Sequence, residues 1–334
     1  MSPLAFIVAV VIVAWTYDFF NGMNDAANAI ATTVSTRALT PRQAIVLART
    51  MNFAGAFLTT EVARTIGKGI VHPDALTQAV VLGAVVGAAA WAGICTRLGI
   101  PISITHSLVA GMIGAGWVSG GLGALNLHRL TSIGYGMIFS PLGGFLGGFA
   151  LMLASYWALR RLMPGVVTRI FRYGQILSAA YVSLAHGAND TQNAMGIITA
   201  ALLAGNFIQE FEVPLWVIVG SAFFMALGTS VGGWRVIRTL GMRLVKLQPV
   251  QGFSAEVSAA TSITAATLMG IPISTTHVIS TAIMGVGAAR RLSAVRWGIA
   301  GHIVAAWIFT FPGAAAIAAA AYFLITLFLV RSGG

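Results

Sequence analysis

Ten apolar runs, most of them as long as a membrane-crossing helix, alternate with short polar segments along this chain of 334 residues. The runs are 4–33, 44–60, 76–94, 102–118 and 133–159, followed by 176–203, 214–231, 257–269, 273–286 and 297–330. About 20 helical residues cross a bilayer core of roughly 30 Å. The runs lack the apolar–polar alternation of the strands in a membrane barrel. The pattern therefore predicts an all-α, polytopic membrane protein.

The composition agrees with this pattern and excludes most other classes of protein. The chain is 57% hydrophobic and 8% charged, whereas soluble domains carry about 25% charged residues. A soluble enzyme, a disordered chain and a disulfide-linked scaffold are therefore excluded. The single cysteine, Cys95, cannot form a disulfide within the chain. Segment 4–20 lacks a basic flank and a small-residue cleavage site, so we expect a first membrane element rather than a cleavable signal.

The net charge of +11 would indicate nucleic-acid binding in a soluble protein. In a membrane protein it has another origin, because Arg and Lys concentrate in cytoplasmic loops. We therefore expect no nucleic-acid partner. We expect a multi-pass protein of the plasma (inner) membrane, surrounded by the lipid bilayer, with its basic loops in the cytoplasm.

Two motifs occur twice, in the same order and at nearly the same offset. The segment 24–29 (NDAANA) returns at 189–194 (NDTQNA), and 99–106 (GIPISITH) returns at 270–277 (GIPISTTH). Chance explains such a pair of repeats poorly. The chain is therefore predicted to consist of a first transmembrane repeat (1–159), a basic cytoplasmic linker (160–173) and a second transmembrane repeat (174–334).

The loop charges predict that the two repeats are inserted in opposite directions. The loop after the first NDAANA motif is basic, with Arg37 and Arg42, whereas its counterpart at 206–213 is acidic. The signs then exchange, since 64–74 is mixed while 235–246 holds four basic residues and no acid. Equivalent loops would thus face opposite sides of the membrane, as in the inverted repeats of many secondary transporters. We expect both termini outside, and broken helices or re-entrant segments that meet at a midplane site.

Asp25 and Asp190 lie inside apolar runs, next to Gly22 and Gly187. A carboxylate at membrane depth needs a cation, a proton or a basic partner, and neither run contains Arg or Lys. We expect the glycines to break the helices and free backbone carbonyls for a cation. The alternative is that these polar groups only join helices, which two symmetric copies disfavour. The predicted sites for Na+ or a coupling proton comprise Asn24, Asp25, Asn28, Asn189, Asp190 and Asn193.

The repeated proline motifs predict an anion site. Pro101 and Pro272 suit the first turn of a helix. The hydroxyls that follow would lie beside free backbone N–H groups, which is the chemistry of an anion site at a helix N-terminus. The alternative is that these residues only cap a helix. The predicted anion ligands are Ser103, Thr105, Ser274, Thr275 and Thr276.

Four further polar residues have open roles. His106 and His277 follow the two anion motifs and are expected to be structural, with anion contact or proton transfer as alternatives. Glu61 and Glu256 are either interfacial charges or members of a third cation site. The sequence has no zinc-type His/Cys cluster and no nucleotide-binding loop. We therefore expect neither a cofactor nor an enzyme.

The segments 22–29, 186–196, 101–106 and 272–277 resemble the signatures of the inorganic phosphate transporter (PiT) family, and 35–44 and 66–71 are similar to it more weakly. The resemblance extends over nearly the whole chain. It implies secondary active uptake of inorganic phosphate, driven by Na+ or H+, by a homodimer. It also implies that Asp25, Asn28, Asp190 and Asn193 hold the coupling ions, and that the five predicted anion ligands hold phosphate. The sequence departs from symmetry where Ile104 stands opposite Thr275 and Gln192 opposite Ala27.

The sequence thus predicts a symporter that takes up inorganic phosphate with Na+ or H+ by alternating access. The alternatives are a transporter of another tetrahedral oxyanion, such as sulfate or arsenate, and an anion channel. A channel would use the same anion sites but would not need the paired carboxylates.

Overall fold

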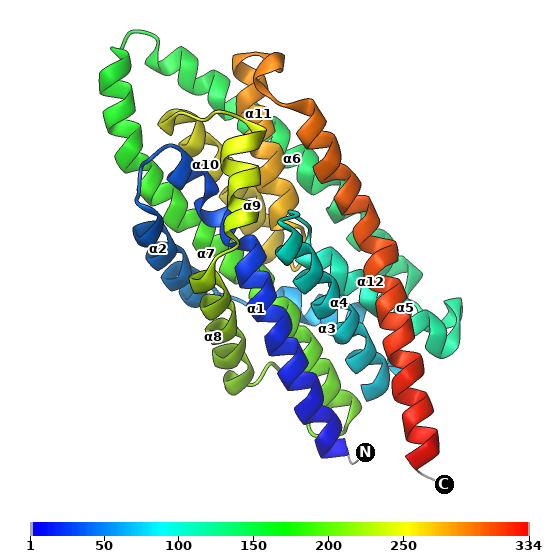
Figure 1. Ribbon diagram of the computed structural model, residues 1–334. Coiled ribbons are helices and arrows are strands. Elements are labelled where there is room, and N and C mark those ends of the chain that lie inside the picture. Colours follow the sequence, from blue (N-terminus) through cyan, green and yellow to red (C-terminus); the bar gives the residue numbers. More distant parts are fainter. Residues whose placement is uncertain (1–2, 333–334) are drawn as a thin grey trace.

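The computed structural model describes residues 3–332, and within that range helices are joined by short turns and irregular segments, with two isolated β-bridges, Val71–Leu125 and Val245–Val295 (Figure 1). The first half contains α1 (Pro3–Ser35), α2 (Pro41–Gly55), α3 (Glu61–Gly69), η1 (Pro73–Ala75), α4 (Gln78–Leu98), α5 (Ile104–Gly120), η2 (Leu122–Ala124) and α6 (Leu127–Leu159). The second half contains α7 (Pro164–Ala204), α8 (Leu215–Val231), α9 (Trp234–Arg238), the π-helical turn η3 (Thr239–Leu244), α10 (Pro249–Leu268), α11 (Thr275–Arg290), η4 (Leu292–Ala294) and α12 (Trp297–Ser332).

Several helices meet the length and apolarity needed to cross a membrane. These are α1, α4, α6 and α12, together with α8 and the α9–η3 segment, which form a pair bent by 61°. The prediction of an all-helical polytopic membrane protein is confirmed. The basic segment 160–173 comprises a short turn and the first residues of α7.

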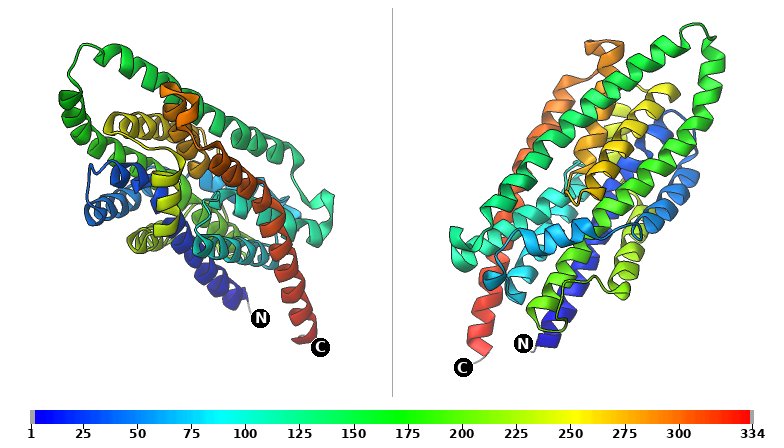
Figure 2. Two further views of the ribbon diagram at one scale, coloured as in Figure 1. Left: turned by 45° about the horizontal axis from the view of Figure 1, so that its top comes forward. Right: turned by 180° about the vertical axis from the view of Figure 1, so that it is seen from behind.

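The helices of the two halves pack mainly against each other (Figures 1 and 2). α1 lies along α8 and α7, α2 lies against α7 and α8, α6 lies against α11, and α12 lies against α4 and α5. An apolar cluster surrounds the N-terminal part of α1 and the C-terminal part of α7. A second cluster surrounds the opposite ends of the same two helices. The polar motifs occupy the middle of α1 and α7, between the two clusters.

Two segments that the charge pattern treats as loops are short amphipathic helices. α3 buries Val62 and Ile66, and the α9–η3 segment buries Val236, Leu240 and Leu244. Apolar residues three or four positions apart fall on one face of a helix, so both segments pack inward while their basic residues point outward. The basic residues of both segments are exposed, but the interpretation of these two segments as loops is wrong.

The basic segments gather at one end of the molecule, away from both chain ends (Figure 1). The segments 36–43, 160–173, 235–246 and 290–296 hold two, four, four and three of the nineteen Lys and Arg residues and no acid. Hydrogen bonds join 290–296 to 235–246: the Arg296 amide donates to the Leu244 carbonyl (3.1 Å), and its guanidinium donates to the Arg243 carbonyl (3.4 Å). Thr36 donates to Gln175 (2.7 Å), two residues beyond 160–173.

Candidate functional site

The two Asn–Asp motifs lie in the middle of α1 and α7, both of which are continuous helices. The expected helix break beside Gly22 and Gly187 is therefore wrong. The glycines instead permit close helix crossings: a Cβ on Gly22 would overlap the carbonyl oxygen of Met225 on α8, and a Cβ on Gly187 would overlap that of Asn52 on α2. Because the helices stay intact, their backbone carbonyls are bonded internally. These segments therefore offer side chains as ligands.

The helix breaks lie instead between α4 and α5, at 99–103, and between α10 and α11, at 269–274. Each break has a glycine in the left-handed region near its start, Gly99 with a φ of +74° and Gly270 with a φ of +67°. Glycine adopts this backbone without steric cost, which explains its presence at both positions.

Pro101 and Pro272 lie inside these breaks and not in the first helical turn, so that expectation is wrong. The helices begin after Ser103 and Ser274, whose side chains accept hydrogen bonds (3.1 Å each) from the backbone N–H three residues later. An N-cap serine satisfies one free N–H of the helix. The proline of each motif lies two residues before this serine. Each serine hydroxyl keeps its own hydrogen for donation.

Asn24 and Asn189 hold the two breaks in place. The Asn24 amide donates to the Ile100 carbonyl (3.3 Å), and the Asn189 amide donates to the Ile273 carbonyl (3.1 Å). The Oδ1 atom of Asn189 accepts a hydrogen bond from Thr267 (3.1 Å), whereas that of Asn24 has no partner among the described residues. The two predicted ligands are therefore not equivalent.

The two carboxylates converge on the N-terminus of α11. Thr275 donates to Asp190 (2.9 Å) and lies 3.4 Å from Asp25, while Thr276 donates to Asp25 (3.0 Å). The Asn28 amide donates to Thr276 (2.9 Å). All five side chains are buried. The structure thus brings the predicted cation ligands and predicted anion ligands into one hydrogen-bonded cluster.

The N-terminus of α5 is less richly connected. The Asn193 amide donates to Thr105 (2.9 Å), as Asn28 does to Thr276. Ile104, opposite Thr275, supplies no hydroxyl, and its carbonyl accepts a hydrogen bond from Tyr17 (3.1 Å). Among the contacts of the described residues, Thr105 has no hydrogen bond to either aspartate.

His186 is a member of the site that residue-by-residue reasoning missed. Its Nε2 atom lies 3.3 Å from a carboxylate oxygen of Asp190 and 3.7 Å from one of Asp25, and its Nδ1 atom lies 3.1 Å from Asn52 Oδ1. The spacing of four residues before Asp190 places both side chains on one helix face. That spacing was the available signal, but the position is Asn21 in the other half, so the search for repeats did not select it.

Asp25, His186 and Asp190 together can hold a cation. Their ligand atoms lie within 4.8 Å of one another. The Oδ1 atoms of Asn28 and Asn193 are buried and have no hydrogen-bond partner among the described residues. Unpaired amide oxygens beside carboxylates suit a hard cation, and the imidazole suits a proton. The donor set therefore fits either kind of coupling ion.

His106 and His277 lie directly behind the threonines of the two anion motifs. Their rings meet edge to face with centroids 4.4 Å apart, and His277 stacks on Trp307 at 3.7 Å. Both line an apolar cavity of about 1,090 Å³ between α5, α6, α11 and α12. These ring contacts agree with a structural role.

Glu256 is fully buried on α10 and joins three helices. It accepts hydrogen bonds from Thr32 and Thr33 on α1 and from Gln175 and Ser178 on α7. Four donors on one carboxylate offset much of the cost of its burial. Glu256 is therefore enclosed between helices, whereas Glu61 lies exposed at the first residue of α3.

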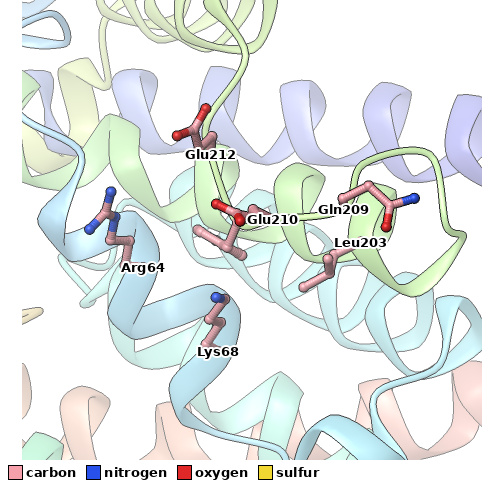
Figure 3. Close-up of a pocket in the computed structure, with 7 residues that line it drawn as sticks. Arg64, Lys68, Leu203, Gln209, Glu210 and Glu212 are labelled. Atoms are coloured by element: carbon pink, nitrogen blue, oxygen red, sulfur yellow. The ribbon is translucent and has the colours of Figure 1, made fainter.

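A hollow of about 350 Å³ opens at the surface beside α3, outside the buried cluster (Figure 3). Arg64 and Lys68 approach it from α3, and Glu210 and Glu212 approach it from the loop after α7. The mixed and acidic segments of the two halves therefore share one rim of the protein.

Taken together, the helices define a polytopic membrane protein with a buried polar cluster in which two helix breaks lie beside two buried carboxylates. A model of the Phosphate transporter family matches residues 21–318. The chain belongs to this family, and this membership confirms that it is a transporter and not an enzyme.

Individual relatives and a solved structure agree. The "Probable low-affinity inorganic phosphate transporter" of Rhizobium meliloti is 45% identical over 98% of this chain and 99% of its own length. A Bacillus subtilis protein with the same description is 43% identical over 96% of this chain and 97% of its own length. The solved structure titled "The sodium-dependent phosphate transporter" superposes with a TM-score of 0.88 at 29% identity, covering 97% of this chain and 99% of that one.

Proposed function

We propose that this protein takes up inorganic phosphate together with Na+ by alternating access around the buried cluster. The observation that carries the proposal is the pair of threonines at the start of α11, which donate hydrogen bonds to Asp25 and Asp190. Donors suited to an anion are joined to carboxylates suited to a cation. Binding at one site therefore changes the hydrogen bonding of the other.

Phosphate would bind between the N-termini of α5 and α11. A helix N-terminus carries a partial positive charge and free N–H groups that favour an oxyanion. The cluster contains no Arg or Lys, so phosphate can be released without breaking a strong ion pair. Its proposed ligands are Ser103, Thr105, Ser274, Thr275 and Thr276.

The cation would bind at Asp25 and Asp190, with Asn28 and Asn193 supplying amide oxygens and Asn24 and Asn189 orienting the helix breaks. Once a cation offsets the carboxylate charge, the threonine hydroxyls can turn from the carboxylates to phosphate. Each ligand then raises the affinity of the other by the same factor. This reciprocity is the physical basis that we propose for symport.

Two observations favour Na+ over H+ as the coupling ion. The solved structure that this chain resembles is described as sodium-dependent, and the unpaired amide oxygens around the carboxylates suit a metal cation. A proton carried by His186 or by one of the aspartates is the alternative.

The test is uptake of radiolabelled phosphate into proteoliposomes under an inward Na+ gradient, and then under a proton gradient alone. We expect accumulation with Na+. Asp25→Asn should abolish uptake and leave the protein folded, whereas Asp74→Asn, at an exposed acid in η1, should transport normally. Full accumulation by Asp25→Asn would contradict the assignment.

The same assay separates the alternatives. Sulfate or arsenate that competed better than unlabelled phosphate would indicate another oxyanion as the substrate. An anion channel could not accumulate phosphate against its gradient.

We further propose that residues 1–159 and 174–334 are repeats of opposite orientation joined by the basic segment 160–173. The clustering of basic residues at one end supports this arrangement, with that end in the cytoplasm of a plasma-membrane protein. The PiT resemblance supports a homodimer.

A further inference from the structure

Asp18 is a buried carboxylate that the proposed phosphate and cation sites do not use. It lies on α1, seven residues before Asp25, and is fully buried. Neither of its carboxylate oxygens has a hydrogen-bond partner among the described residues. An ionised carboxylate in such surroundings is strongly disfavoured. Some positive species must therefore accompany it.

The polar side chains next to Asp18 are uncharged. Asn21 follows one turn later on the same side of α1, and Ser221 on α8 interacts with the Asp18 carboxyl. The Oδ1 atom of Asn21 and the hydroxyl of Ser221 also have no hydrogen-bond partner among the described residues. Among the described residues, the Asp18 carboxylate therefore has no donor within hydrogen-bond distance.

No described basic side chain forms an ion pair with Asp18. α8 has no titratable residue, and on α1 itself Tyr17 adjoins Asp18. Among the titratable groups of the helices packed against α1, Asp190 interacts electrostatically with Asp18, and it is an acid. The titratable or charged groups on those helices are Arg42, Arg49, Cys95, Arg97, Arg169, Arg172, Tyr173, Tyr181, His186, Asp190, Arg235, Arg238, Arg243, Glu256, His277 and Arg290.

A metal ion does not fit this place. Hard cations such as Ca²⁺ take about six to eight oxygens. α1 and α8 are unbroken here, so their carbonyls are bonded within the helices. Only three side chains remain. A single proton suffices, because it turns the carboxylate into a neutral acid that can donate to Ser221 or Asn21.

Packing does not require an acid at this helix crossing. In the other half, Ser183 takes the place of Asp18 and donates to the Ala179 carbonyl of its own helix (2.6 Å), and Ala48 takes the place of Ser221. The equivalent crossing of α7 and α2 thus packs with a serine and an alanine. The Asp18–Ser221 pair is therefore present at only one of the two equivalent helix crossings.

We propose that Asp18 is a proton-binding site separate from the phosphate site, and that it exchanges its proton when α1 moves against α8 during transport. α1 carries both Asp18 and Asp25, so a rearrangement that opens the phosphate site also changes the surroundings of Asp18. The proposal rests on the phosphate transport proposed above. It adds a proton dependence that Na+ coupling alone does not give.

The test compares wild-type protein with Asp18→Asn, which mimics the neutral acid, and with Ser183→Ala as the matched control at the equivalent position. Phosphate uptake into proteoliposomes is measured as a function of pH under a fixed Na+ gradient, with the proton gradient collapsed. The protonated fraction of one acid falls about tenfold per pH unit above its titration midpoint. Wild type and Ser183→Ala should therefore lose uptake more steeply as the pH rises than Asp18→Asn, which should keep only the pH dependence of the phosphate species themselves.

A second readout does not depend on transport. Infrared difference spectra of the purified proteins should show the C=O stretch of a protonated carboxyl group in wild type, absent from Asp18→Asn. If Asp18→Asn is inactive, Asp18→Glu should restore uptake together with its pH dependence. Infrared spectra in which wild type and Asp18→Asn show the same carboxyl band would overturn the proposal. Equal pH profiles of wild type and Asp18→Asn would also overturn it. Failure of the wild type to accumulate phosphate at any pH would instead refute the proposed function.

Discussion

Replacing Thr276 by valine should separate the two roles that we assign to the α11 N-terminus. The Thr276 hydroxyl donates to Asp25 (3.0 Å) and accepts from the Asn28 amide (2.9 Å). Valine keeps the shape of the side chain but removes both bonds. A hydrogen bond to a charged group contributes about 1.5–3 kcal/mol, and a tenfold change in affinity corresponds to about 1.4 kcal/mol. We therefore expect the half-saturating phosphate concentration to rise by roughly 10- to 150-fold.

The assay measures initial rates of phosphate uptake, first against phosphate at saturating Na+ and then against Na+ at fixed phosphate. Thr105→Val is the matched control, because Thr105 accepts from Asn193 (2.9 Å) and has no hydrogen bond to either aspartate among the described contacts. Both variants should weaken the response to phosphate, but Thr276→Val alone should also shift the response to Na+. The reasoning is refuted if the two variants shift the Na+ response equally, or if Thr276→Val leaves the phosphate response unchanged.

Two further predictions concern packing and orientation. Gly22→Ala would drive a Cβ into the α8 backbone and should destabilise the protein by about 1–3 kcal/mol, seen as a lower thermal midpoint in detergent. Gly143→Ala, where a Cβ would meet no atom within 4 Å, should not lower the midpoint, and equal midpoints for the two variants would contradict the packing argument. In a Cys95→Ala background, a cysteine at Gln209 should react with an impermeant maleimide in intact cells, and one at Ala38 only after permeabilisation. Labelling of both from the same side would exclude the inverted arrangement.

Repetition explains how far sequence reasoning could reach. Asp25 and Asp190 stand out because each lies in an apolar run and each is part of a motif that occurs twice. The same repetition led from two helix-start motifs to the N-termini of α5 and α11. It could not reveal that Thr275 lies within reach of both carboxylates, because the contact with Asp25 joins the two halves and the contact with Asp190 joins residues that are 85 positions apart.

The errors share a physical cause. A glycine in a polar motif is compatible with a helix break or with a close crossing, and the choice depends on a partner helix far away in the sequence. For Gly22 that partner is α8. His186 and Asp18 were missed for a related reason: each is titratable in one half only, because Asn21 stands opposite His186 and Ser183 opposite Asp18, so a comparison of the halves did not single them out.

The way the two halves interlock also governs how the protein is made. α1 packs along α8, which begins 180 residues after α1 ends, from Ser35 to Leu215. During synthesis, Asp25 must therefore enter the membrane long before Thr275 and Thr276 exist to donate to it. Until the second half emerges, the polar side chains of the otherwise apolar helix α1 lack those hydrogen-bond partners. During early insertion, Asp25 must therefore be shielded from lipid by water, by the translocation machinery or by the other helices of the first half. A truncated first half should be a substrate for quality-control proteolysis.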